Sequence, residues 1–433
     1  MINQREMALR VRDTAKVLFS RGPLWSLGDQ IIVSGGNFLT MVIVARQVGL
    51  ASFGVFTLYW TSALIVAAMH TSFLILPMVV LRAQNAQGQL ARYDSIVAGL
   101  HLSFVGLTLA MWLPLSAAAI ALGLIDGSVA LSLGAYTAFA LMHEYLRRFI
   151  FLEDRYLELT ISDMVRYLLQ LLTLHLLGGQ LGHTIAAVFW ILAGSALVGC
   201  LICLRHMPRP AVERDESMAV AMRHWSSSKW LLSSSLLSWL STNSLMYLTG
   251  AYAGAAAVGG MRASQNLAGI LGIPLQGLQN VVPTEAAKAL AELQLKGLRS
   301  YLMKVGGGLL AVGLVVTAII AGAPDQWLEL VYGDEFTGYG LLLIGYALAF
   351  TASVLELPIS AGLRAIERTR PVFVAYLLGA VFTLVGGAVL VPLYGVWGAM
   401  AVILAVWVIR ILVVLRSLAI ELDVRRPDSE LAQ

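Results

Sequence analysis

Residues 371–409 have the sequence PVFVAYLLGAVFTLVGGAVLVPLYGVWGAMAVILAVWVI, without a single Asp, Glu, Lys or Arg. A helix that crosses a bilayer needs about 20 mostly apolar residues, so this stretch is too long for one helix. It is interrupted by Pro392-Leu393-Tyr394-Gly395, a sequence typical of a turn. The stretch therefore predicts two membrane-spanning helices that are joined by a short connection.

Further apolar stretches along the chain predict an all-α polytopic membrane protein. Hydrophobic residues make up 58% of the 433 positions and charged residues 12%, against about 25% charged in soluble domains. This composition excludes a soluble enzyme, a disordered chain and a nucleic-acid-binding protein. A second long uncharged stretch, 167–204, is divided by the glycine-rich residues 178–182. Twelve helices are predicted near residues 24–45, 53–81, 96–122, 128–150, 158–177, 184–204, 229–248, 257–282, 303–322, 337–358, 371–390 and 396–416.

The distribution of Lys and Arg sets the expected orientation, because these residues gather in cytoplasmic loops. If the N-terminus is cytoplasmic, all but four of the 29 basic residues fall in the terminal segments and the loops on that side. Arg147 and Arg148 are assigned to one of these loops. The remaining four, Arg46, Arg166, Arg262 and Arg410, lie at or inside the membrane. Both termini are therefore predicted to be cytoplasmic.

The longest cytoplasmic loop, residues 205–228, predicts a linker between two six-helix lobes, 24–204 and 229–416. Residues 1–23 form a basic segment that is either an interfacial helix or a disordered tail, and residues 417–433 form a second cytoplasmic tail. The segment 48–54 (VGLASFG) is weakly similar to 253–259 (AGAAAVG). Six helices in each half predict a parallel repeat, an architecture of transporters in which a central cavity lies between the halves.

Several motifs resemble a known transporter family. They are Asp29-Gln30, Asn37-Phe38, Ala45-Arg46-Gln47-Val48-Gly49, Phe53-Gly54, Val258-Gly259, Gln265-Asn266-Leu267, Val331-Tyr332-Gly333-Asp334-Glu335-Phe336, Val391-Pro392-Leu393-Tyr394-Gly395 and Gly398-Ala399. Together they resemble Wzx-type polysaccharide flippases of the multidrug/oligosaccharidyl-lipid/polysaccharide (MOP) exporter superfamily. These motifs are glycine and hydrophobic patterns rather than a catalytic signature.

The resemblance implies two lobes around a central cavity that opens alternately to each side of the bacterial inner membrane. It implies a cargo of oligosaccharide on polyprenyl diphosphate, used for polysaccharide biosynthesis and export, with no enzymatic activity and no cofactor. Membrane lipids, a polysaccharide polymerase and glycosyltransferases are the further expected partners. Two alternatives stay open. A drug/cation antiporter of the same superfamily would favour acids in its cavity, and a membrane-embedded glycan polymerase would usually carry a large outer loop.

The predicted eighth helix carries the clearest candidate site. Its polar residues recur at spacings of three and four and share one helical face. The substrate-binding candidates on this face are Arg262, Gln265, Asn266, Gln276 and Asn280. An arginine can hold phosphate oxygens through two hydrogen bonds, and amides suit sugar hydroxyls. The alternative is that these residues pack the helix against a neighbour.

Two other predicted helices add candidates. On the first helix, Gln30 and Asn37 share a face and are assigned to substrate binding, while Asp29 is the candidate for ion coupling or for a structural ion pair. On the fifth helix, Asp163 and Arg166 are spaced to pair with each other. If Arg166 faces the cavity instead, it is a second phosphate-binding candidate. The histidines and cysteines show no metal-ligand spacing, so no metal site is predicted.

Overall fold

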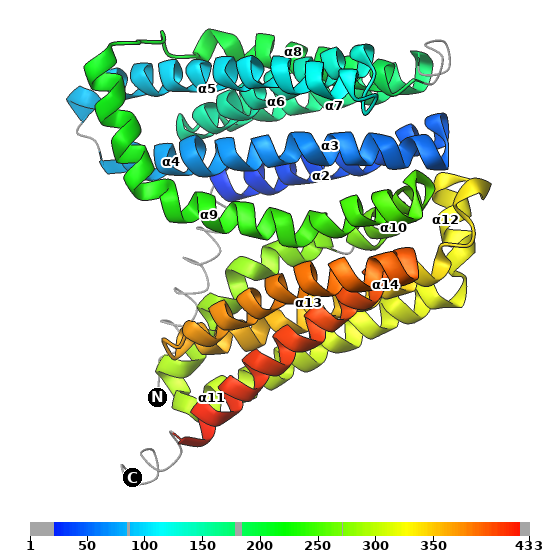
Figure 1. Cartoon of the computed structure of the whole chain (residues 1–433). Helices are drawn as coiled ribbons and strands as arrows, with labels where there is room; N and C mark the ends of the chain where they lie inside the picture. Colours follow the sequence, from blue (N-terminus) through cyan, green and yellow to red (C-terminus); the bar gives the residue numbers. More distant parts are fainter. Residues whose placement is uncertain (1–20, 85–86, 178–183, 271, 425–433) are drawn as a thin grey trace. The chain divides into compact units, whose positions relative to one another are not determined.

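The computed structural model describes residues 21–84, 87–177, 184–270 and 272–424, and all of its regular secondary structure is helical (Figure 1). The prediction of an all-α protein is confirmed. The elements in chain order are α2 (Arg21–Val48), α3 (Leu50–His70), η1 (Thr71–Ile75), α4 (Leu76–Gln84), α5 (Gln87–Ala121), α6 (Gly127–Leu152), α7 (Tyr156–Leu177), α8 (Ile185–Cys203), η2 (Leu204–His206), α9 (Arg214–Ala253), α10 (Ala255–Gly269), α11 (Gly272–Gly322), α12 (Pro324–Tyr332), η3 (Asp334–Phe336), α13 (Gly340–Ala365) and α14 (Arg370–Val424). Most of the basic segment 1–23 and the turn at 178–182 lie outside the described residues.

Two of these elements each contain two helices that meet at a kink. In α14 the kink is at Gly395, which has φ 55° and ψ −134°, a conformation that favours glycine. This confirms the turn predicted within 371–409. In α11 the kink is at Gln294, with φ 55° and ψ −153°. The predicted single helix 257–282 is wrong: α10 ends at Gly269 and α11 begins at Gly272. Pro274 follows closely and has no N–H to donate to the preceding turn, which explains the interruption.

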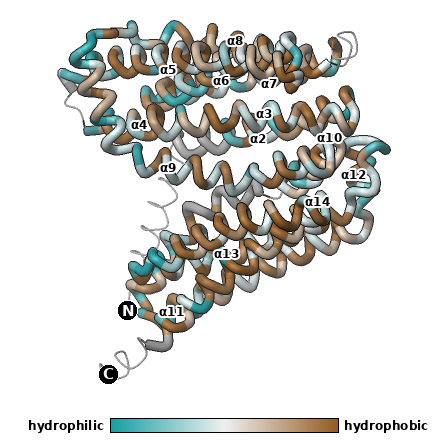
Figure 2. Tube along the Cα trace, in the orientation of Figure 1, coloured by the Kyte–Doolittle hydropathy of each residue, from teal (hydrophilic) through white to brown (hydrophobic). Residues whose placement is uncertain are grey.

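Seven helices in the described part of the chain are long and apolar enough to cross a membrane. They are Gly28–Val48, Leu50–Gln84, Gly88–Ala121, Ile185–His206, Val281–Gly322, Gly340–Ala365 and Arg370–Leu422. Figure 2 shows long hydrophobic runs along α13 and α14, with hydrophilic residues gathered near helix ends. The two longest of the seven contain the kinks in α11 and α14. The kink at Gly395 divides Arg370–Leu422 into two helices of spanning length, whereas the part of Val281–Gly322 before Gln294 is too short to span a membrane.

The chain divides into two compact units. Unit 1 contains Met1–Gln47 and Ser62–Leu236, and unit 2 contains Val48–Thr61 and Leu237–Gln433. In unit 1, α6 packs against α5, α7 and α8. In unit 2, α13 packs against α10, α11 and α14 (Figure 1). The first turns of α3 therefore cluster with unit 2, and both α3 and α9 run from one unit into the other.

A proline changes the path of the helical run from α3 to α4. Pro77 has no N–H, so the carbonyl of Phe73, four residues earlier, loses its usual helical donor. Residues Thr71–Ile75 form a π-helical turn there. The Nδ1 of His224, from α9, donates to the Phe73 carbonyl at 3.4 Å, and its Nε2 lies 2.8 Å from the Tyr93 hydroxyl. His224 thus connects α9 to two other helices inside unit 1.

Two glycines allow α3 and α10 to pack closely within unit 2. A Cβ added at Gly54 would overlap the Ala255 carbonyl oxygen, and one added at Gly259 would overlap the Leu50 carbonyl oxygen. Both glycines belong to the similar segments 48–54 and 253–259. Because the obstructing atoms belong to backbone, Gly54→Ala is expected to lower the free energy of unfolding by about 1–3 kcal/mol or more.

This expectation can be measured by thermal unfolding of the purified protein in detergent. Gly307→Ala is the matched control, since a Cβ at that position meets nothing within 4 Å. The control should leave the unfolding temperature unchanged or raise it slightly. Equal unfolding temperatures for the two variants would contradict close packing at Gly54.

Candidate functional site

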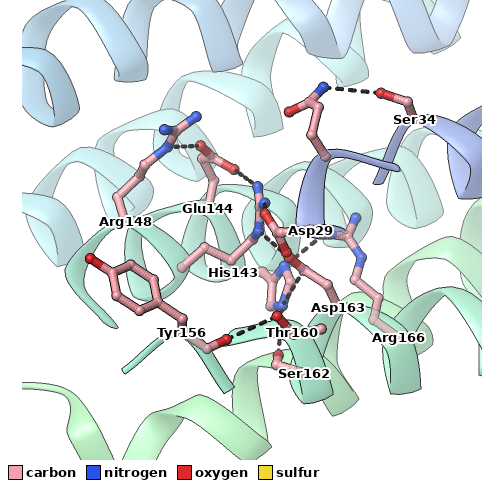
Figure 3. A network of polar contacts seen from close by, with 12 residues as sticks. Asp29, Ser34, His143, Glu144, Arg148, Tyr156, Thr160, Ser162, Asp163 and Arg166 are labelled. Carbon is pink, nitrogen blue, oxygen red and sulfur yellow. Dashed lines mark hydrogen bonds and ion pairs between the residues drawn. The ribbon is translucent and has the colours of Figure 1, made fainter. Parts of the chain in front are cut away.

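Three carboxylates in unit 1, those of Asp29, Glu144 and Asp163, lie close together (Figure 3). They surround the guanidinium of Arg147. Its Nη2 lies 2.7 Å from Asp29 Oδ2, its Nε 2.7 Å from Asp163 Oδ2, and its Nη1 2.9 Å from Glu144 Oε2. Arg147 lies in the last turns of α6, which continues to Leu152, and not in a loop. Compensation by three acids from α2, α6 and α7 is what allows a guanidinium to lie inside the helical bundle.

The pairing predicted within α7 is also wrong. Asp163, which is fully buried, bonds to Arg147 of α6 rather than to Arg166 of its own helix. Arg166 instead approaches the Nδ1 of His143 with its Nη1, at 2.7 Å. The reason is that helical spacing makes two residues neighbours on a face but does not decide which helix lies opposite them.

Arg166 and Asn37 belong to one neighbourhood in unit 1. The guanidinium of Arg166 lies 5.2 Å from the ring centroid of Tyr167, and the Tyr167 hydroxyl donates to Asn37 Oδ1 at 3.2 Å. Gln30, in contrast, donates to Ser34 in the next turn, at 3.0 Å, and is exposed. The structure therefore brings two of the three unit 1 candidates for substrate binding together and leaves Gln30 apart.

Glu356 and Arg410 form an ion pair in unit 2, in which the Glu356 side chain is buried. Arg410 Nη2 lies 2.8 Å from Glu356 Oε2. The same guanidinium lies 3.8 Å from the ring centroid of Tyr376 and 4.3 Å from that of Trp407. These contacts link α13 to α14, and Glu356 neutralises the charge of Arg410.

Arg262, on α10, is a partly buried arginine with different neighbours. Its Nη1 donates to Gln265 Oε1 at 3.0 Å, and its Cζ lies 5.0 Å from the ring centroid of Trp60 on α3. Its Nε is buried and has no hydrogen-bond partner among the residues that the structure describes. Within the described ranges, no carboxylate lies within 4.0 Å of this guanidinium, whereas Arg147 has three such neighbours and Arg410 has one. No acid in the described part of the chain therefore neutralises the positive charge of Arg262.

The neighbours of Arg262 are amides and aromatic rings. Asn266, the next candidate along α10, donates through Nδ2 to the Tyr332 hydroxyl at 2.8 Å. Tyr332 is 2% exposed and lies at the end of α12. Gln276 and Asn280 are in α11, and their side chains lie outside the described part of the structure. The described site in unit 2 thus consists of Arg262, Gln265 and Asn266 with aromatic support.

Sequence reasoning missed Trp60 and Tyr332. A signal was present for Trp60, because Phe53, Phe56 and Trp60 follow one another at spacings of three and four on α3. Such a stripe of aromatic residues is typical of packing, and nothing local indicates that an arginine from another helix lies against it. Tyr332 occurs in one of the motifs of the family resemblance, where no role was assigned to its side chain.

An uncompensated buried guanidinium favours an anionic ligand. A charge taken out of water is costly unless it is paired, and a bound anion supplies the missing partner. Phosphate groups match the planar N–H edge of arginine through two parallel hydrogen bonds. The geometry in unit 2 therefore suits a phosphate or diphosphate group, with amide groups nearby for hydroxyl ligands. Among the described residues no cluster of His, Cys, Asp and Glu could hold a metal ion.

Comparison with known proteins supports a transporter fold. Residues 231–389 match the MatE family model. No curated protein sequence matches the chain. Among solved structures, an inward-facing multidrug resistance MATE family transporter of the MOP superfamily is similar, with a TM-score of 0.65 and 15% identity, over 96% of this chain and 98% of the other. The lipid II flippase MurJ in an inward closed conformation gives a TM-score of 0.65 and 15% identity, over 92% and 87% of the two chains.

A third similar structure is a MOP superfamily transporter from Pyrococcus furiosus, described as having a binding pocket of reversed polarity that suggests a different function. Its TM-score is 0.57 at 15% identity, and 92% of this chain and 94% of the other are covered. These likenesses extend over almost the whole chain. The protein is therefore a helical membrane protein with the fold of MOP superfamily transporters, and its segment 231–389 matches the MatE family model.

Proposed function

We propose that this protein is a flippase that moves oligosaccharide linked to polyprenyl diphosphate across the bacterial inner membrane by alternating access, for polysaccharide biosynthesis and export. The observation that carries the proposal is Arg262, a partly buried cation without a carboxylate partner in the described residues. Both termini would lie in the cytoplasm. A polysaccharide polymerase and glycosyltransferases are the proposed partners that use and supply the cargo.

The chemistry of the cargo matches this site. A diphosphate must lose water on entering the membrane, and a guanidinium with free N–H groups replaces the lost hydrogen bonds. Gln265 and Asn266 are the proposed contacts for sugar hydroxyls, together with Gln276 and Asn280 of α11 and Gln30 of α2. Arg166 and Asn37 are the corresponding candidates in unit 1.

The membrane potential would favour outward release of this cargo. Because the cell interior is negative, an anion gains about 2.3 kcal/mol per charge per 100 mV on moving outward. Asp29 is our candidate for additional coupling to a cation. Its Oδ2 accepts from Arg147, while its buried Oδ1 has no hydrogen-bond partner in the described part of the chain. A proton or Na⁺ at Oδ1 would compete with Arg147 for this carboxylate.

A drug/cation antiporter is the second candidate, and two observations favour it. The segment 231–389 matches the MatE model, and the buried acids of unit 1 include Asp163 and Asp29. Since an antiporter of cations needs an acid that its substrate can reach, the compensation of these acids by Arg147 argues for the flippase.

The proposal is tested by depleting the protein in its native host. Polyprenyl-diphosphate-linked glycans would be quantified by mass spectrometry, and their leaflet determined with a probe that does not cross the inner membrane. Complete glycan units retained on the cytoplasmic side are the expected result. Units that reach the outer leaflet normally would overturn the proposal: failed chain growth would then indicate a polymerase, and new drug sensitivity with unchanged polymer an antiporter.

A further inference from the structure

Trp60 lies at the end of a row of stacked aromatic rings within unit 2. Its ring is nearly parallel to that of Phe56, with centroids 6.5 Å apart and an interplanar angle of 11°. Phe56 stacks in turn on Phe53, at 6.3 Å and 19°. Phe53 is fully buried, and Tyr332 and Phe336 lie against it at centroid distances of 6.4 and 6.0 Å. Phe53 is therefore fixed by its buried neighbours, and the stacked rings hold Trp60 in one orientation.

The guanidinium of Arg262 lies over this supported ring. The distance from Arg262 Cζ to the Trp60 centroid is 5.0 Å, within the range in which a cation is attracted to the face of an indole. An aromatic face attracts the charge without accepting the in-plane hydrogen bonds of the guanidinium. A carboxylate would accept those hydrogen bonds and cancel the charge, as Asp163 does for Arg147 and Glu356 does for Arg410.

The remaining contacts of Arg262 leave donors available. Of the five N–H groups of a guanidinium, one on Nη1 donates to Gln265 Oε1, and the buried Nε has no partner among the described residues. Gln265 restrains one end of the planar group, while Trp60 restrains its face. A ligand that approaches in the plane of the guanidinium can therefore form two parallel hydrogen bonds, which is the geometry that phosphate oxygens require.

We propose that Trp60 is a positioning residue that holds the Arg262 guanidinium by its face and so keeps its charged edge open for the diphosphate of the cargo. This inference rests on the proposed function, since it assigns the means by which the same site recognises a diphosphate. Trp60 confers selectivity for an anionic headgroup, and it does so through Arg262 rather than by contact with the phosphate.

The test measures binding of farnesyl diphosphate, a short polyprenyl diphosphate, to the purified full-length protein in detergent, with farnesol as the uncharged comparison. Trp60→Leu is expected to weaken binding of farnesyl diphosphate about 3- to 30-fold while leaving farnesol binding unchanged. Trp60→Phe retains an aromatic face and should weaken binding less than Trp60→Leu. In an Arg262→Ala background, Trp60→Leu should cause no further loss.

The possible outcomes distinguish a failure of the proposed role of Trp60 from a failure of the proposed flippase function. If Arg262→Ala weakens diphosphate binding and Trp60→Leu does not, the positioning role is overturned while the flippase proposal stands. Equal weakening of farnesol and farnesyl diphosphate by Trp60→Leu would likewise overturn it, since that is the effect of lost packing. If Arg262→Ala leaves diphosphate binding unchanged, the proposed function fails together with the inference. Should Trp60→Leu not fold, Trp60→Phe and its double variant with Arg262→Ala decide the question.

Discussion

Replacing Arg147 by Ala is expected to lower the free energy of unfolding by about 3–5 kcal/mol, enough to remove most folded protein from the membrane. The guanidinium of Arg147 bonds to Asp29, Asp163 and Glu144. Asp163 is fully buried and Asp29 is 8% exposed, so neither carboxylate can regain its hydration when the cation is lost. The yield of monodisperse protein and its unfolding temperature in detergent measure the effect.

Arg148→Ala is the matched control for this prediction. Arg148 is the next residue on α6 and bonds to Glu144 at 2.8 Å, but half of its side chain is exposed. Its loss should cost no more than about 0.5 kcal/mol, as for other solvated helix pairs. A second test is the double variant Arg147→Ala/Asp163→Asn. It replaces the buried, unpaired carboxylate of Asp163 by a neutral amide and should recover part of the free energy of unfolding. Similar behaviour of the two single variants would show that Arg147 does not compensate the buried acids.

Arg262→Ala is expected to reduce glycan flipping at least about tenfold while the protein still folds. A hydrogen bond to a charged group contributes about 1.5–3 kcal/mol, and each 1.4 kcal/mol corresponds to a factor of ten. Folding should persist because, in the described ranges, no buried carboxylate depends on Arg262 for compensation. Flipping of a fluorescent polyprenyl-diphosphate-linked glycan in proteoliposomes provides the measurement.

Two further variants make the Arg262 experiment specific. Arg262→Lys retains the charge but loses the planar pair of donors, and should recover only part of the activity. Arg364→Ala removes an exposed arginine from α13 of the same unit and should leave flipping unchanged. Wild-type flipping by Arg262→Ala would exclude this residue from the transport site.

Much of the fold could be predicted from sequence because the thickness of the bilayer sets the length of each membrane-spanning helix. A run of 39 uncharged residues exceeds one membrane span, and Gly395 supplies the positive φ that the connection requires. Pro274 in the sequence indicates the interruption between α10 and α11. A prediction from hydropathy alone, however, treats the two helices as one, because the whole segment is apolar. Apolar length and local backbone chemistry are properties of a segment by itself.

The partners of charged residues were harder to predict. Arg147 has the sequence context of a cytoplasmic arginine, beside Arg148 near a helix end, yet it lies among three acids. Asp163 has an arginine three residues away on its own helix, yet it bonds to one on α6. Helical periodicity determines which residues share a face, whereas the residue opposite depends on how helices pack.

The candidate site likewise has features that the sequence predicts and features that depend on helix packing. The sequence by itself determined that the chain is a helical membrane protein and that Arg262 lies on a polar face with Gln265 and Asn266, because these features depend on apolar length and helical spacing. Only the tertiary structure decided that this arginine meets Trp60 and no described carboxylate, while Arg147 and Arg410 are compensated. The physical reason is that the state of a buried charge depends on groups that come within a few ångströms of it, and those groups come from helices far away in the chain.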